Sequence, residues 1–121
     1  MADEISMSAT LAISATNFKE SFQPGNITID LASTAGAGGT QTIGTSYEQV
    51  TKGDTAAGGV FFFRNVDETN YVEVGVEVSS AFHALIKLLP GEFSVGRLAT
   101  ADVFAKANTA SVNLQYRMLS P

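Results

Sequence analysis

Apolar and polar residues alternate with period two along most of the 121-residue chain, and no stretch keeps a convincing 3.6-residue apolar period. Successive side chains of a β-strand point to opposite faces, so this alternation is typical of strands with one buried face. The pattern predicts strands over residues 5–14, 27–31, 41–50, 60–66, 71–78, 82–88, 93–97, 102–107 and 112–118.

Turn-forming residues separate these strands. Loops are expected at "NFKESFQPGN" (17–26), at the glycine-rich "STAGAGGT" (33–40) and at "TKGDTAAGG" (51–59). "LPGE" (89–92) fits a tight turn, because Pro presets φ at its second position and Gly accepts a positive φ at its third. Eight or nine short strands with turns between them predict an all-β fold. We expect a single antiparallel, jelly-roll-like β-sandwich over residues 1–121, with an N-terminal strand or arm over about 1–15.

The stretch "VFFFRNVDETNYVEVGVEV" looks like a β-hairpin. Residues 60–66 and 71–78 are expected to pair antiparallel across "DETN". On the return strand Val72, Val74 and Val76 share one face, so they are expected in the core.

Three consecutive phenylalanines leave an aromatic ring on both faces of the first of these strands. Phe61 and Phe63 point one way, whereas Phe62 and Arg64 point the other. Burying a phenylalanine is worth roughly 1.5–3 kcal/mol, so a fully exposed Phe62 would be unusual. Two interpretations remain open: a loop of the same chain covers Phe62, or Phe62 lies in an interface with another subunit.

The segment "FHALIKLL" raises the same alternative. Leu85 and Leu89 are expected on the face opposite Phe82, Ile86 and Leu88. Apolar residues on both faces of two strands favour association. The candidate interface residues are therefore Phe62, Arg64, His83 and Leu85.

Composition and charge narrow the possible partners. The net charge of −5 repels nucleic-acid phosphates and anionic membranes, so neither is an expected partner. Charged residues are only 16% of the chain, which favours a surface that partly meets another protein. The acidic N-terminus resembles no signal peptide and no apolar run suits a membrane helix, so we expect synthesis in the cytoplasm.

No residue pattern points to catalysis. There is no cysteine, and the single His83 excludes histidine clusters and most metal sites. Glu73 and Glu77 are four residues apart on one strand, roughly 13 Å, which exceeds the separation of a glycosidase pair. We therefore expect no enzyme, no cofactor and no metal site. A sugar-stacking platform remains open through Tyr47, Tyr71 or Tyr116.

Three segments resemble small all-β virion structural proteins of tailed bacteriophages. They read "FFFRNVDETNYVEVGVEV", "FHALIKLLPGEF" and "VFAKANTASVNLQYRM", and lie within Phe61 to Met118, about half of the chain. The shared features are an "RN-D-TN-V-VG" cassette, an "L-PGE" turn and an "AKAN-A" segment. The resemblance implies a structural protein of the particle, above all a capsid decoration or cement protein that bridges capsid subunits.

The same resemblance implies a homo-oligomer, a trimer or dimer, located in the virion and in contact with the major capsid protein or other virion proteins. It leaves open a tail or head–tail joint component. From a different class, a carbohydrate-binding adhesion module also remains open. A cement protein needs exposed apolar patches, whereas an adhesion module needs an aromatic or carboxylate-lined groove.

Overall fold

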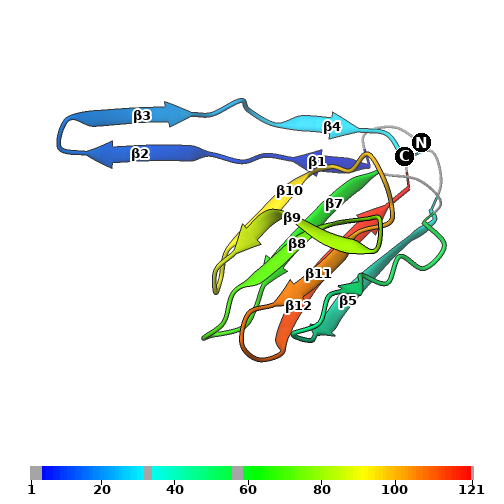
Figure 1. Ribbon diagram of the computed structural model, residues 1–121. Helices are drawn as coiled ribbons and strands as arrows, with labels where there is room; N and C mark the ends of the chain where they lie inside the picture. Colours follow the sequence, from blue (N-terminus) through cyan, green and yellow to red (C-terminus); the bar gives the residue numbers. More distant parts are fainter. Residues whose placement is uncertain (1–3, 32–33, 56–58, 121) are drawn as a thin grey trace. The chain divides into compact units, whose positions relative to one another are not determined.

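The computed structural model describes residues 4–31, 34–55 and 59–120 (Figure 1). The chain forms two compact units, Met1–Ala32 and Ser33–Pro121. All regular structure in these described ranges is β, arranged in four antiparallel sheets, so the all-β prediction is confirmed. The described ranges contain twelve strands and no helix that could span a membrane.

The first unit is a long two-stranded ribbon, here called the N-terminal hairpin. Its outer part pairs β2 with β3 and its inner part pairs β1 with β4. The predicted loop at 17–26 is wrong where β3 forms, because Phe18 pairs with Ala15 and Phe22 with Leu11. The strands are β1 (Ile5–Met7), β2 (Leu11–Ala15), β3 (Phe18–Phe22) and β4 (Ile27–Ile29).

In the second unit, residues 34–55 and 59–120 form two four-stranded sheets. One has the order β10-β7-β12-β5 and the other has the order β6-β11-β8-β9. The first sheet comprises β5 (Gly36–Ile43), β7 (Val60–Asn65), β10 (Phe93–Arg97) and β12 (Val112–Leu119). The second comprises β6 (Glu48–Gln49), β8 (Val72–Val78), β9 (Ala81–Leu88) and β11 (Phe104–Ala107).

The predicted hairpin across "DETN" is wrong. Strand β7 pairs with β10 and β12, whereas β8 pairs with β9 and β11, so "DETN" passes from one sheet to the other. Short loops of this kind can either reverse a strand within a sheet or cross between sheets. The alternation of apolar and polar residues in β7 and β8 is compatible with both arrangements.

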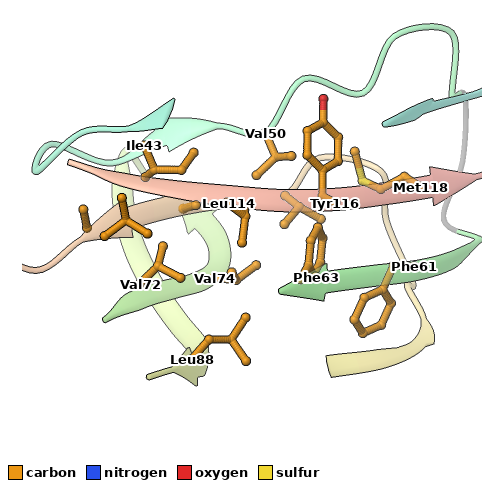
Figure 2. Packing of buried hydrophobic residues seen from close by; sticks show 14 residues of the cluster. Ile43, Val50, Phe61, Phe63, Val72, Val74, Leu88, Leu114, Tyr116 and Met118 are labelled. Atoms are coloured by element: carbon orange, nitrogen blue, oxygen red, sulfur yellow. The ribbon is translucent and has the colours of Figure 1, made fainter. Parts of the chain in front are cut away.

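One apolar cluster contains most of the buried hydrophobic residues of both sheets (Figure 2). Phe63 and Leu114 from the first sheet and Val72 and Val74 from the second are almost entirely inaccessible to solvent. The core positions predicted for Val72 and Val74 are confirmed, while Val76 is half-buried. The remaining labelled members in Figure 2 are Ile43, Val50, Phe61, Leu88, Tyr116 and Met118.

A buried asparagine joins the loops at the crossing between the sheets. The Asn65 side-chain amide donates to the carbonyl oxygens of Asn70 and Leu88, at 2.9 Å each, and its oxygen accepts from the Asp67 amide at 2.8 Å. The Asn65 backbone also bonds to Gly91 and Glu92 of the "LPGE" turn. Asn65 thereby connects β7, the "DETN" loop, the end of β9 and the next turn.

Two further local features follow from backbone geometry. Gly91 has φ 85° and Glu92 donates to Leu89, so the "LPGE" turn is confirmed. The register shifts between Val74 and Gly75, where a Cβ at Gly75 would collide with the His83 carbonyl oxygen. The resulting bulge separates the faces of β9, and the shared face predicted for Phe82, Ile86 and Leu88 is therefore wrong.

The glycine-rich segment predicted as a loop at 33–40 is wrong over Gly36 to Thr40, which begins β5. Eight residues of β5 pair continuously with β12. Strand 41–50 is correspondingly broken: β5 ends at Ile43 and β6 covers only Glu48–Gln49. Glycine has a low intrinsic strand propensity, so the sequence predicted a loop here. Pairing with the long strand β12 overrides that propensity.

Replacing Asn65 with leucine should destabilise the second unit strongly. The change leaves three buried or half-buried backbone groups without their partner, at roughly 1–3 kcal/mol each. We expect the free energy of unfolding to fall by about 3 kcal/mol or more, measured by urea denaturation. Asn113→Leu is the matched control, because Asn113 is exposed and its side chain bonds only Thr42 among the described residues. Equal losses in the two variants would contradict the role assigned to Asn65.

Candidate interaction face

The outer side of the β10-β7-β12-β5 sheet gathers large apolar and basic side chains. Directly opposed residues share a face, and Phe62 is opposite Val95 and Arg117, while Arg64 is opposite Phe93. We call this surface the arginine face and define it by Phe62, Arg64, Phe93, Val95, Arg97, Gln115 and Arg117.

Two phenylalanines form the apolar centre of the arginine face. The ring of Phe62 lies 6.4 Å from that of Phe93, with 27° between their planes. Phe62 is half-buried, whereas Phe93 is 58% exposed. Phe62 is thus partly covered by a ring from the neighbouring strand, and the outer side of this aromatic pair faces solvent.

Every arginine of the chain lies on this face. Arg64, Arg97 and Arg117 are all exposed, and Arg97 is opposite Val60 on the same side as the others. The four strands of the sheet contain no Asp or Glu. Within residues 4–31, 34–55 and 59–120, none of the three guanidinium groups forms an ion pair. A chain of net charge −5 therefore carries a local surface with charge +3.

A glycine provides the space for one of these guanidinium groups. A Cβ added to Gly38 would approach the Arg117 side chain to 3.0 Å, so the arginine lies across the backbone of β5. Beside it is a hollow of about 290 Å³, lined by Gly39, Thr40, Phe62, Gln115, Tyr116 and Arg117. The hollow combines an aromatic ring with a guanidinium group, which can form charge-assisted hydrogen bonds to a carboxylate.

The other two candidate residues lie elsewhere. His83 and Leu85 are both on β9, at the edge of the second sheet, and both are exposed. Leu85 is 73% exposed and lines an apolar cavity of about 140 Å³ together with Phe63, Ile86 and Leu98. The structure thus brings Phe62 and Arg64 to one face and places His83 and Leu85 on another sheet.

The second sheet has an aromatic cluster on its outer side. The Tyr47 ring stacks on Phe82 at 5.5 Å and meets the edge of Phe104 at 5.9 Å. The Tyr47 hydroxyl lies 2.8 Å from a Glu77 carboxylate oxygen and 3.2 Å from the Ser80 carbonyl oxygen. A hollow of about 350 Å³ beside this cluster is lined by Gln49, Val76, Glu77, Thr100, Asp102 and Phe104.

These surfaces present aromatic rings beside charged and polar side chains. The residues placed by the structure include no group of three or more His, Asp or Glu side chains that could hold a metal. The exposed His83 is opposite Val76, and no hydrogen bond to its side chain is found in the described part of the chain. The face is suited to apolar contact and to charge-assisted hydrogen bonds from arginine.

Sequence reasoning missed Phe93, Arg97 and Arg117 as members of the face. The alternation does indicate that Phe93, Val95 and Arg97 share one face of their strand, because they are two residues apart. The missing information was that β10 and β12 flank β7. Neighbouring strands here are distant in sequence, so the pattern gave no signal for this.

No protein-family model, curated protein or solved structure matches this chain.

The environment of Tyr47 predicts a measurable pH effect. The hydrogen bond to Glu77 is the largest cause raising the pKa of Tyr47 above its ordinary value, followed by desolvation and repulsion from the Glu77 charge. Neutral phenol is therefore favoured, and Glu77→Ala should lower the pKa of Tyr47. An NMR titration of the Tyr47 ring would measure this. Glu73→Ala, on the same strand, is the control and should leave the Tyr47 titration unchanged; equal shifts in both variants would contradict the assignment.

Proposed function

We propose that this chain is a non-enzymatic structural protein of a bacteriophage particle, a capsid decoration or cement protein that bridges neighbouring capsid subunits. The observation that carries the bridging role is the arginine face. Protein interfaces are enriched in aromatic residues and arginine and depleted in lysine and acidic residues. The strands of this sheet contain Phe62, Phe93 and three arginines but no Lys, Asp or Glu.

The strand order supports a jelly-roll sandwich as the architecture behind this role. The described residues of the second unit, 34–55 and 59–120, contribute eight strands in two sheets, and consecutive strands such as β5 and β6 or β7 and β8 alternate between the sheets. Both sheets contribute to one core, as expected of a sandwich. Jelly rolls occur in viral capsid proteins and in lectins, so this support for a virion role is an argument from fold analogy.

The assignment to a phage particle is supported by the sequence resemblance. Its three motifs meet around the crossing between the sheets: Asn65 bonds the "LPGE" turn, and Asn108 and Thr109 of the "AKAN-A" region bond Tyr71 and Asn70. These motifs are therefore structural, in line with a protein that contributes surfaces and no reaction. The proposed place is the virion, in contact with the major capsid protein, after synthesis in the host cytoplasm.

The proposed mechanism is burial of the arginine face against acidic and apolar groups of a neighbouring subunit. Exposed Phe93 contributes apolar area, and the arginines bind carboxylates with two hydrogen bonds each where geometry allows. A tail or head–tail joint component would use the same face on a different neighbour. The position of the protein in particle images distinguishes these two sites.

A carbohydrate-binding adhesion module is the second candidate. The observation that favours it is the cluster of Tyr47, Phe82 and Phe104 beside a hollow whose lining includes Gln49 and Asp102. Aromatic faces with nearby polar side chains suit sugar rings. Against it, Tyr47 stacks on Phe82 within the chain, so part of its face is already covered.

Phe62→Ser tests the proposed function. The ring is half-buried and stacked on Phe93, so its loss should lower the free energy of unfolding by only about 1 kcal/mol. Binding to particles should weaken by tenfold or more, because a central apolar contact is lost. The measurements are the melting temperature and the occupancy on particles stripped of the protein and then reloaded.

Phe82→Ser is the matched control, because Phe82 is also half-buried and stacked on one aromatic ring. It should leave particle occupancy unchanged. If Phe62→Ser leaves occupancy intact while Phe82→Ser abolishes binding to a glycan array, the adhesion function replaces the proposed one. A collapse in melting temperature with unchanged occupancy per folded molecule would show that Phe62 has only a packing role.

A further inference from the structure

We propose that the N-terminal hairpin of one copy of this chain docks on the arginine face of a second copy. The inference rests on the proposed function and deepens it: the neighbouring subunit whose acidic and apolar groups cover the arginine face is a second copy of this chain. It is carried by the two faces of the hairpin, by the charges of the two surfaces and by the exposure of both.

The outer part of the hairpin is amphipathic across its two faces. The pairs Leu11–Phe22, Ile13–Glu20 and Ala15–Phe18 share one face, and the pairs Ala12–Ser21 and Ser14–Lys19 share the other. Nearer its base, the pairs Ile5–Ile29 and Met7–Ile27 are apolar, and Ser6–Thr28 between them is polar. One face is thus almost entirely apolar along the ribbon.

This apolar face is open to solvent. Leu11 is 60% exposed, and Phe18, Phe22 and Ile27 are about half exposed. A two-stranded ribbon has no second layer of its own and is marginally stable in water, since stability needs a third strand or a packed partner. A sequence that alternates so regularly over β2 and β3 therefore implies a surface that covers this face.

Charge favours the arginine face as that surface. Glu20 is the only charged residue among the three pairs on the apolar face of β2 and β3. Residues 1–32 carry four acidic side chains and one lysine, a net charge of −3. The arginine face carries three cations around Phe62 and Phe93, with no acid in its strands. The hairpin therefore presents apolar area with one carboxylate, and the arginine face presents apolar area with three guanidinium groups. The two surfaces are complementary in charge.

The exposure of the two surfaces favours a second copy over the same chain. Leu11, Phe18 and Phe22 of the hairpin and Phe93 of the arginine face are all more than half exposed in the single chain. The contact joins two different surfaces, so repetition of it around an axis closes a ring such as a trimer, and a reciprocal exchange gives a dimer.

The apolar part of the proposal is tested on the full chain with Phe18→Ser/Phe22→Ser. Both rings are at least half exposed, so the melting temperature of the second unit should not change. The dissociation constant for self-association, measured by analytical ultracentrifugation over a concentration series, should rise at least tenfold. Ala12→Ser/Ser21→Ala, on the opposite face of the same strands, is the matched control and should associate like the parent.

A charge exchange tests the partner surface without relying on the phenylalanines. Glu20→Arg alone should weaken association, as should Arg64→Glu, Arg97→Glu or Arg117→Glu. Combining Glu20→Arg with at least one of these three should restore association by tenfold or more relative to the single variants. An absence of rescue in all three combinations would overturn the arginine face as the docking surface.

Three outcomes separate this inference from the proposed function. A parent chain that is monomeric at all concentrations, with the hairpin amides protected from hydrogen exchange, would mean that the hairpin packs within its own chain and would overturn the inference. Hairpin variants that associate normally but lose particle occupancy would show that the hairpin binds a capsid protein instead, which overturns the inference and leaves the function standing. Rescue of self-association without binding to particles would support the inference and reject the function.

Discussion

The second unit depends on the buried side chain of Asn65, which satisfies three backbone groups where the chain passes between sheets. Its amide reaches Leu88 and Asn70, and its oxygen holds the amide of Asp67. The Asp67 carboxylate in turn accepts from the backbone amides of Asn70 and Thr69, which lowers the pKa of Asp67 below its ordinary value. Buried backbone groups must be paired, so this one residue permits a tight crossing that would otherwise leave them unsatisfied.

The sequence predicted the positions of most strands of the second unit correctly, but it predicted the wrong pairing at this crossing. Alternation located β8, β9, β10 and β12 within a few residues and put Val72 and Val74 in the core, because each is a local property of a half-buried strand. Pairing is not local. Nothing in the spacing of "DETN" distinguishes a reversal from a crossing. Asn65 bonds Asp67 and Asn70 within the loop, but its bond to the Leu88 carbonyl oxygen exists only once β9 is in place.

Only the part of the arginine face that lies on a single strand could be predicted from the sequence, because pairing between strands is not a local property. The alternation placed Phe62 and Arg64 together on the outer side of one strand. The remaining members come from β10 and β12, whose positions beside β7 follow from the topology of the whole unit. The glycine-rich start of β5 was also misread: Gly38 leaves room for the Arg117 side chain, so a residue that weakens a strand in isolation here shapes the surface beside it.

The distribution of charge sets how such surfaces can recognise a partner. Copies of a chain with net charge −5 repel one another at long range, and salt reduces this repulsion over about 10 Å at 0.1 M ionic strength. Attraction must therefore come from short-range contact between patches whose sign differs from that of the whole molecule. The arginine face is such a patch, since all three arginines of the chain lie there and the four strands of its sheet contain no Asp or Glu. The arginine face then selects a partner by apolar complementarity together with a few carboxylates. Elsewhere on the molecule, the net negative charge repels an acidic partner.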